Sequence, residues 1–361
     1  MTHPTPNARA RLKEAERFCV DILPRVSRTF AISIKWLPGH LGRSVLVAYL
    51  LCRIADTVED DATSDVIRKS ALLDRLLACF DDPAVADAYG SEASDIQGEA
   101  NHVQLVRNAD RVFAMFRSLP APSRAVVQRW VREMVLGMKK FVQLYPRGIR
   151  IETLAEYKEY CYYVAGTVGH LLTDLWHEHR PLTIGRARYH ALMAKCSQFG
   201  EALQTVNILK DIAWDAEHEN AIYIPGQALR AMGSSHEELL SPARQGANHA
   251  VISDFIDMAS RDLDEALEYT LTIPRRALAI RIFCVLPLLF AQATLRDLMA
   301  SRAMLKSGGQ VKISRSEVRA LLFVGPMLIF SNAGVRWLVA KVRAKPFTLG
   351  AAPAAVQFAS T

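Results

Sequence analysis

The sequence has little of what marks secreted, membrane-spanning or zinc-binding proteins. Its 361 residues include six cysteines, and no two of them form a Cys-x-x-Cys pair. Most of these cysteines lie inside apolar runs, which is typical of buried, reduced thiols in a cytosolic protein. Residues 1–10 are polar and lack the apolar core of a signal peptide. The apolar stretch at residues 320–330 is too short to cross a bilayer. We therefore expect a cytoplasmic protein.

The sequence also lacks any sign of β structure. No segment alternates between apolar and polar residues, and no internal repeat or low-complexity block is present. No Gly-x-Gly-x-x-Gly motif follows a strand, so a Rossmann cofactor site is not supported. Apolar residues recur with a helical period along nearly the whole chain. This pattern predicts a single all-α domain at residues 1–345, with helices around a central cavity, and a frayed tail at 346–361.

The helical pattern is interrupted by prolines, glycines and polar segments, which give approximate element boundaries. Residues 27–30 are interpreted as a loop or a helix start, and residues 81–95 as a surface connection. Helices are predicted at about 8–23, 43–60, 67–80, 98–117, 122–145, 151–176, 187–215, 235–271, 274–304 and 315–342.

The net charge of +7 favours an anionic partner such as a diphosphate, a membrane surface or a nucleic acid. The positive charges are scattered, and no module of alternating aromatic and basic residues is present. We therefore expect no nucleic-acid binding.

Two pairs of aspartates stand four residues apart, each near the polar end of an apolar helical run. The first pair is Asp56 and Asp60, and the second is Asp211 and Asp215, preceded one turn earlier by Asn207. Residues at i and i+4 share one helix face, where like charges repel by a few tenths of a kcal/mol. Either pair alone could equally be a solvated helix end. Together they predict Mg²⁺ or Mn²⁺ ions that hold a substrate diphosphate.

Three segments carry a resemblance to a known family. They are Asp-Thr-Val-Glu-Asp-Asp at 56–61, Tyr-Cys-Tyr-Tyr-Val-Ala-Gly at 160–166 and Asn-Ile-Leu-Lys-Asp at 207–211. In their residues and in their order along the chain, they resemble the motifs of the head-to-head trans-isoprenyl diphosphate synthases, which make squalene, dehydrosqualene or phytoene. The resemblance covers about residues 20–315. It implies the isoprenoid-synthase helical fold, Mg²⁺, and prenyl diphosphate substrates joined through a cyclopropyl intermediate.

Further segments are similar to the squalene-forming branch of that family. They are Ser-Arg-Thr-Phe at 27–30, the run at 49–56, and Gln-Val-Lys-Ile-Ser-Arg at 310–315. This branch condenses two farnesyl diphosphates to presqualene diphosphate and reduces it with NADPH. The resemblance implies that Lys312 and Arg315 bind NADPH. Lys210, Asn220 and Ser314 stand where arginines are common in the family, which makes the reductive step less secure than the condensation.

The resemblance also implies a role for each candidate site residue. Asp56, Asp60, Asp211 and Asp215 would be catalytic metal ligands, with Asn207 as a further ligand. Tyr160 would relay a proton or face a carbocation, although an isolated tyrosine at helical spacing is more often part of a core. The remaining candidates would bind substrate: Ser27, Arg28, Tyr49, Arg53, Glu59, Gln204, Asn207, Lys210 and Phe283. Arg53 could instead be a snorkelling side chain, and Tyr49 and Phe283 could be ordinary core residues.

Two alternatives remain open. One is condensation without reduction, which gives phytoene, dehydrosqualene or hydroxysqualene. The other is a non-catalytic helical scaffold that binds membranes or partners. Residues 320–342 combine an apolar stretch with Arg336, Lys341 and Arg343, as in an interfacial helix, but the same pattern suits a packed core helix. We expect peripheral membrane contact; the sequence indicates neither prenyl chain length with certainty nor oligomeric state.

Overall fold

The computed structural model describes residues 6–348, except for the side chains of residues 6–8 and Arg28. Within this range the structure is built from helices, and its only β pairing is an isolated parallel bridge between Arg150 and Ile222. The prediction of an all-α fold is therefore confirmed. Most of the predicted tail, residues 349–361, lies outside the described residues.

Six helices form the centre of the molecule. They are α3 (Gly39–Glu59), α8 (Ala121–Leu144), α10 (Thr167–His179), α12 (Cys196–Trp214), α14 (Gln245–Thr272) and α15 (Leu278–Met299). All of them except α14 line the cavities described below. Helix α3 contacts α8 and α10, while α12 contacts α10, α14 and α15. Helix α15 is apolar and long enough to cross a membrane, but 83% of its most apolar window is buried inside the protein. It therefore serves as a core helix.

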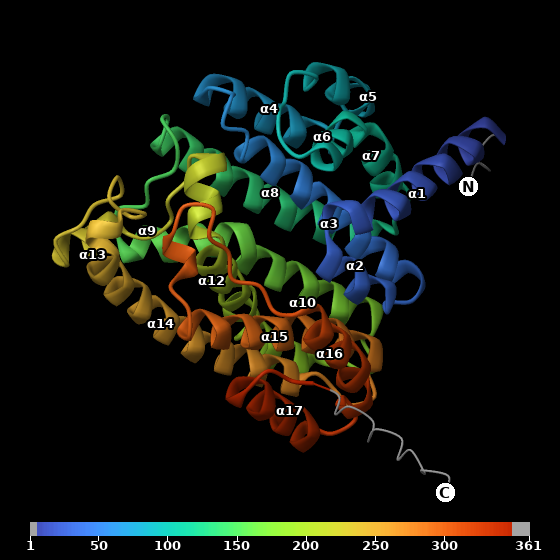
Figure 1. Cartoon of the computed structure of the whole chain (residues 1–361). Helices are drawn as coiled ribbons and strands as arrows, with labels where there is room; N and C mark the ends of the chain where they lie inside the picture. The colour runs from blue at the N-terminus through green and yellow to red at the C-terminus, as the bar shows by residue number, and fades with distance from the viewer. Residues whose placement is uncertain (1–5, 349–361) are drawn as a thin grey trace, which may run out of the picture.

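Shorter helices cover this centre from opposite sides (Figure 1). Helices α4 to α7 lie at one end of the molecule, next to α3 and α8, whereas α16 and α17 pack on the outside of α15. The peripheral helices are α1 (Pro6–Val26), α2 (Arg28–Lys35), α4 (Val66–Ala78), α5 (Pro83–Glu92), α6 (Ala100–Arg107), α7 (Ala109–Ser118), α9 (Leu154–Cys161), α11 (Arg186–Met193), α13 (Gly226–Ala231), α16 (Arg315–Leu328) and α17 (Asn332–Ala344).

Several predicted boundaries were wrong because short polar signals were overlooked. The supposed connection at 81–95 contains α5, which starts with a hydrogen bond from the Ala84 amide to the Asp82 carboxylate and with Pro83 in its first turn. The predicted helix at 98–117 is divided at Asn108. The long helices predicted at 187–215 and 315–342 are each divided in two, and the Ser331 hydroxyl caps the second part of the latter. Ser27 caps α2, so residues 27–30 are a helix start.

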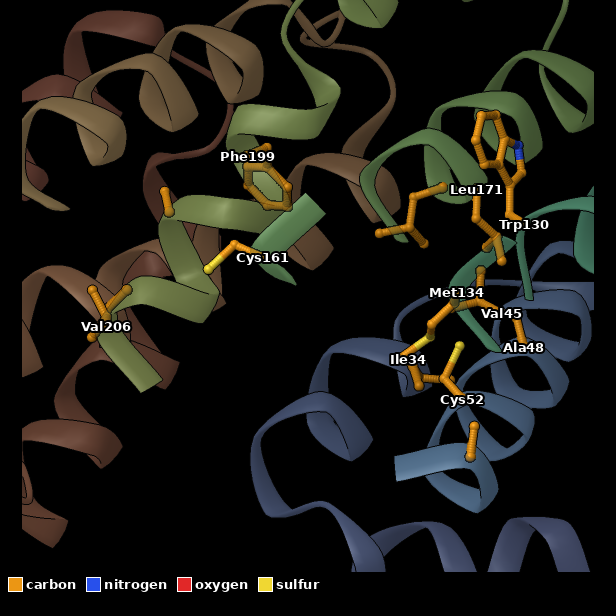
Figure 2. Close-up of a cluster of buried hydrophobic side chains, with 14 of the residues drawn as sticks. Ile34, Val45, Ala48, Cys52, Trp130, Met134, Cys161, Leu171, Phe199 and Val206 are labelled. Carbon is orange, nitrogen blue, oxygen red and sulfur yellow. The ribbon is translucent and has the colours of Figure 1, made fainter. Parts of the chain in front are cut away.

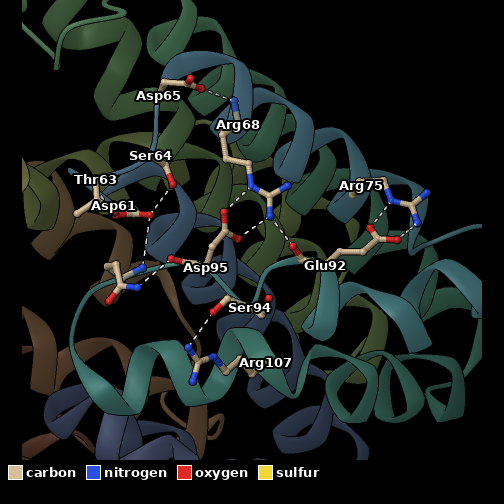
Figure 3. A network of polar contacts seen from close by, with 11 residues as sticks. Asp61, Thr63, Ser64, Asp65, Arg68, Arg75, Glu92, Ser94, Asp95 and Arg107 are labelled. Carbon is tan, nitrogen blue, oxygen red and sulfur yellow. Dashed lines mark hydrogen bonds and ion pairs between the residues drawn. The ribbon is translucent and has the colours of Figure 1, made fainter.

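A polar network fixes the chain that leaves α3 (Figure 3). The Asp61 carboxylate accepts hydrogen bonds from the hydroxyl groups of Thr63 and Ser64, at 2.7 Å and 2.6 Å. Close by, Arg68 forms an ion pair with Asp95, in which Nε lies 2.9 Å from Oδ2. Asp61 therefore anchors the turn that follows the first aspartate pair.

Glycines allow the segments that carry Tyr160 and Asp211 to pack in direct backbone contact. A Cβ atom added to Gly200 on α12 would lie 2.0 Å from the carbonyl oxygen of Ala165. A Cβ atom added to Gly169 on α10 would lie 1.8 Å from the carbonyl oxygen of Cys196. No side chain larger than hydrogen fits at such distances, so these glycines set the spacing between α12 and the segment formed by α10 and the π-helix Tyr162–Gly166 that precedes it.

Gly200→Ala is expected to destabilise the protein by about 3 kcal/mol, because the helices must separate to admit the methyl group. Chemical denaturation measures this loss. Gly246→Ala on α14 is a matched control, since nothing lies within 4 Å of its added Cβ. Alanine should be neutral or slightly stabilising there. Equal stability of the Gly200→Ala variant and the wild type would contradict the tight contact.

Candidate active site

The two aspartate pairs meet across one polar cavity, because α3 and α12 both end at it. Asp56 lies in the last turn of α3 and Asp60 caps that helix, while Asp211 lies on α12 and Asp215 begins the π-helix Asp215–Glu219. The cavity has a volume of about 320 Å³. Its lining comprises Arg53, Asp56, Glu59, Asp60, Tyr160, Val164, Gln204, Asn207, Ile208, Lys210, Asp211, Asp215, Glu219 and Tyr223. Most of the candidate residues therefore surround one space.

The carboxylates of this cavity crowd one another with few positive charges between them. Burial, together with the neighbouring Glu219 and Asp211, raises the pKa of Asp215 to about 9. Burial and then the carboxylates of Glu219 and Glu59 raise the pKa of Asp60 well above its usual range. Each negative charge is costly in these surroundings until a cation joins it.

Basic side chains offset part of this repulsion. Arg53 Nη1 lies 3.4 Å from Asp56 Oδ2, and Lys210 forms an ion pair with the adjacent Asp211. The pKa of Asp56 is nevertheless raised, because burial outweighs the neighbouring Arg53. The two basic groups lie in the same polar cavity, where they could contact a substrate anion.

The donor set suits Mg²⁺ or Mn²⁺. Glu59 is 5% exposed, and its Oε1 atom has no hydrogen-bond partner among the described residues, so a buried acceptor is available at the cavity wall. Among residues 6–348, no three His, Cys, Asp or Glu side chains are gathered closely enough to form a complete protein-made metal site. Mg²⁺ usually binds one or two carboxylates and completes its shell with water and substrate phosphates. The arrangement fits ions that bind together with a diphosphate.

An apolar cavity of about 160 Å³ opens next to the polar one. The two share Arg53, Asp56, Val164, Gln204 and Asn207. Figure 2 shows part of its lining, with Val45, Ala48 and Cys52 of α3 facing Met134 of α8 and Leu171 of α10. The remaining lining residues include Phe30, Ile34, Tyr49, Phe199, Phe283 and Pro287. A molecule with a charged head and a hydrocarbon tail would match this pair of cavities.

Tyr160 lies in the wall of the polar cavity. Its hydroxyl oxygen lies 3.2 Å from Tyr223 Oη and 3.4 Å from Glu59 Oε2, so its one proton can be donated to either group. Its ring stacks on that of Tyr223 with centroids 4.8 Å apart. Burial and then the negative Glu59 raise the pKa of Tyr160 well above its usual range. The phenol therefore stays protonated and is available as a hydrogen-bond donor at the cavity wall.

Four predicted residues lie away from both cavities or outside the described part of the protein. The Ser27 hydroxyl accepts a hydrogen bond from the Phe30 amide at 3.2 Å, which explains it as a helix cap. The side chain of Arg28 lies outside the described part. Lys312 and Arg315 are exposed, on the segment before α16 and at the start of that helix. This segment is tied to the polar cavity's π-helix, because the Gly308 amide donates to Glu217 Oε2 at 3.0 Å.

Two polar residues that line the polar cavity were missed by sequence reasoning. Glu219 follows Asp215 by four residues and Asp211 by eight, so it extends the same helix face and could have been found from that spacing. Tyr223 stands beyond the helix, and no sequence pattern indicated that its hydroxyl would meet Tyr160.

Glu219→Gln is expected to weaken Mn²⁺ binding to the substrate-free protein about threefold to tenfold, because one neighbouring negative charge is lost. Titration calorimetry or the electron paramagnetic resonance signal of free Mn²⁺ measures this. Glu217→Gln is the matched control: Glu217 is on the same π-helix but is exposed and bonded to Gly308. An equal effect of the two substitutions on Mn²⁺ binding would contradict a role for Glu219 in the cation site.

Comparisons with known proteins agree with this geometry. A model of the squalene/phytoene synthase family matches residues 23–317. A squalene synthase of Schizosaccharomyces pombe is 28% identical over 305 residues, which cover 82% of this chain and 64% of the relative. The squalene synthase BSS of Botryococcus braunii is also 28% identical, over 78% of this chain and 59% of the relative. The chain thus spans slightly less than two thirds of these relatives.

Solved structures support the fold. The complex of TcSQS with the ligand BPH1237 superposes with a TM-score of 0.75 at 22% identity, covering 92% of this chain and 98% of that one. A squalene synthase from Alicyclobacillus acidocaldarius gives a TM-score of 0.54 at 18% identity, covering 83% and 97%. The family match covers most of the sequence. The structure adds that both acidic helix ends lie at a polar cavity, which is joined to an apolar one. The chain belongs to the squalene/phytoene synthase family.

Proposed function

We propose that the protein is a squalene synthase, which joins two molecules of farnesyl diphosphate head to head and reduces the resulting presqualene diphosphate with NADPH. One observation carries this proposal: an acidic cavity, whose carboxylates suit Mg²⁺, adjoins an apolar cavity and shares lining residues with it. The similarity to curated squalene synthases supports the choice of reaction.

The polar cavity would bind the diphosphates. The two aspartate pairs, with Asn207, would hold Mg²⁺ ions, which when bound supply Lewis-acid neutralisation of the departing diphosphate. Arg53 and Lys210 would contact its oxygens, Arg53 as a fork and Lys210 as a point charge. Tyr160, whose phenol stays protonated, would hold a proton beside the leaving group.

The apolar cavity would take the prenyl chains and exclude water from the carbocation. Its aromatic members Tyr49, Phe199 and Phe283 offer ring faces that stabilise positive charge. The adjoining Gln204 and Asn207 line both cavities and would stand near the junction of head and tail. Exclusion of water matters because a prenyl cation in water is quenched to an alcohol.

The reductive step is supported by the segment that carries Lys312 and Arg315. Its contact through Gly308 with Glu217 keeps it near the cavity mouth. NADPH would approach from this side, with its phosphates on the two basic side chains.

Asn220 and Ser314 stand where the family commonly has arginines, and their presence favours the second candidate, condensation without reduction. Asn220 adopts a left-handed conformation with φ 52°, and its side-chain amide donates to the Arg147 carbonyl at 2.9 Å. Ser314 caps α16 through a hydrogen bond from the Glu317 amide at 3.1 Å. Both residues have structural roles here and contribute no positive charge for a cofactor phosphate.

Product analysis separates the two candidates. The full chain is incubated with farnesyl diphosphate and Mg²⁺, with and without NADPH, and the products are identified by mass spectrometry. We expect presqualene diphosphate without NADPH and squalene with it. Only unreduced products at saturating NADPH would replace squalene synthase by the second candidate, and no condensation from farnesyl or geranylgeranyl diphosphate would contradict both.

Lys312→Ala is expected to weaken NADPH use about tenfold to hundredfold, because one charged hydrogen bond to a phosphate is lost. Formation of presqualene diphosphate should be unchanged, so this intermediate accumulates when NADPH is scarce. Lys13→Ala, which removes an exposed lysine of α1, is the control. A parallel loss of condensation and reduction would argue against a cofactor role for Lys312.

A further inference from the structure

Helix α16 presents a stripe of large apolar side chains to the surface. Phe323, Met327 and Phe330 are 57%, 56% and 58% exposed. Their spacing of four and three residues places them along one side of the helix and its immediate continuation. Trp337, on the adjoining helix α17, is 50% exposed as well. A cluster of exposed residues of this size marks a binding surface more often than chance.

The stripe does not arise from poor packing of α16. The opposite side of the helix is buried, and Leu321 is inaccessible to solvent. Gly325 lies close to α15, where an added Cβ would meet Leu286 Cδ2 at 3.2 Å and Leu289 Cδ1 at 3.4 Å. The helix therefore has one apolar side that packs on the core and a second that faces outward.

After the first turn of α16, the charged residues that α16 and α17 themselves carry are all basic. No Asp or Glu occurs between Val318 and Thr348. Arg319 stands one turn before Phe323 and is exposed, and Lys341 is exposed with its Nζ 5.8 Å from the ring centroid of Trp337. Two other basic residues of α17 are ion-paired with α14, Arg336 with Glu268 and Arg343 with Asp264. The free positive charges thus flank the apolar stripe.

We propose that the exposed side of α16 and α17 docks the protein on the surface of a bilayer that contains anionic lipids. The apolar side chains would enter the boundary between headgroups and acyl chains, and Arg319 and Lys341 would contact lipid phosphates. A second copy of the chain is a poorer occupant, because pairing of this surface with itself would bring like charges together.

The position of the docking surface fits the chemistry of the apolar cavity. Helix α15 separates the two: Leu286 and Leu289 face α16, whereas Phe283 and Pro287 line the cavity. One helix therefore divides the bilayer surface from the space in which a hydrocarbon would form. The formation of a hydrocarbon in this space rests on the proposed function, whereas the docking surface does not.

Flotation with lipid vesicles tests the proposal without substrate, so its outcome is independent of catalysis. The full chain is mixed with vesicles of phosphatidylcholine alone or of equal parts phosphatidylcholine and phosphatidylglycerol. We expect binding to the anionic vesicles, weakened by salt. Phe323→Ser/Phe330→Ser should lower the affinity at least about tenfold, because two apolar anchors are lost.

A matched control removes exposed apolar side chains elsewhere. Ile67 and Leu182 are 76% and 94% exposed, so Ile67→Ser/Leu182→Ser should leave vesicle binding unchanged. Arg319→Gln/Lys341→Gln should reduce the preference for anionic vesicles while the fold, followed by circular dichroism, is retained. Quenching of Trp337 by brominated lipid, absent in Trp337→Phe, reports the depth of insertion.

Three outcomes would overturn the proposal. The first is that the wild type does not float with anionic vesicles. The second is that the control pair loses binding as strongly as the Phe323/Phe330 pair. The third is that sedimentation velocity finds a dimer that Phe323→Ser/Phe330→Ser converts to a monomer, which would make a second copy the occupant of this surface.

Discussion

Asp215→Asn is expected to lower condensation of farnesyl diphosphate by about three orders of magnitude, equivalent to about 4 kcal/mol of transition-state stabilisation. The amide keeps the shape of the side chain but loses the charge that would hold a divalent cation. Asp60→Asn, on the opposite wall of the polar cavity, should give a loss of similar size. Turnover with farnesyl diphosphate at saturating Mg²⁺ measures both, and removal of the metal by EDTA should abolish activity of the wild type.

The same substitution should stabilise the metal-free protein. The pKa of Asp215 is raised in the folded state, to about 9, so its contribution to stability is present at low pH and is lost as the pH rises from about 4 to about 9. Asp215→Asn removes this loss, and the melting temperature of the metal-free variant should exceed that of the wild type at pH 8. Added Mn²⁺ should raise the melting temperature of the wild type more than that of the variant.

A control for these experiments is Asp257→Asn, because Asp257 is an exposed aspartate of α14 outside both cavities. It should change neither turnover nor the response to Mn²⁺. Full activity of Asp215→Asn, or of the wild type in excess EDTA, would refute the role given to the aspartate pairs.

Tyr160→Phe is expected to reduce turnover about a hundredfold, the usual contribution of a positioned proton donor. The ring should stay in place, since it packs edge-on against Phe141 with centroids 5.2 Å apart and stacks on Tyr223. The loss would therefore come from the hydroxyl. Single-turnover measurements of diphosphate release separate this chemical step from substrate binding, which should be little changed.

Tyr157→Phe provides the comparison. Tyr157 lies one turn earlier on α9 and is equally buried, but it lines neither cavity. Loss of its hydroxyl should leave turnover within about twofold of the wild type. If both phenylalanine variants retained full activity, Tyr160 would be a wall residue without a role in proton transfer.

The sequence could predict those parts of the site that local spacing determines. Asp56 with Asp60, and Asp211 with Asp215, share helix faces because the helical period requires it. The sequence could not indicate that α3 and α12 end opposite each other; the likeness to a known family provided that step. Tyr223 shows the limit, since it reaches Tyr160 only through the path of the chain after Glu219.

For the fold too, the sequence could predict what periodicity determines but not what depends on single local contacts. Apolar periodicity was sufficient to predict an all-helical chain, because each helix has to bury one side. It could not locate the break at Asn108 or the helix within 81–95, where a local cap decides the structure. Ser27, Asn220 and Ser314 were compared with substrate- or cofactor-binding residues, yet each forms a backbone hydrogen bond in the structure that a motif cannot reveal.

The glycine contacts that α12 makes with the helical segment from α9 to α10 also limit how the protein can change shape. Backbones that touch at Gly169 and Gly200 leave no room for sliding, so the wall that carries Tyr160 and the wall that carries Asp211 form one stiff block. Helix α2 itself contains no glycine and contributes Phe30 and Ile34 to the apolar cavity. We therefore expect the domain to close over a substrate by movement of α2 against a fixed frame of α10 and α12. Hydrogen–deuterium exchange should then be slow for the backbone amides of α10 and α12 and fast for those of α2.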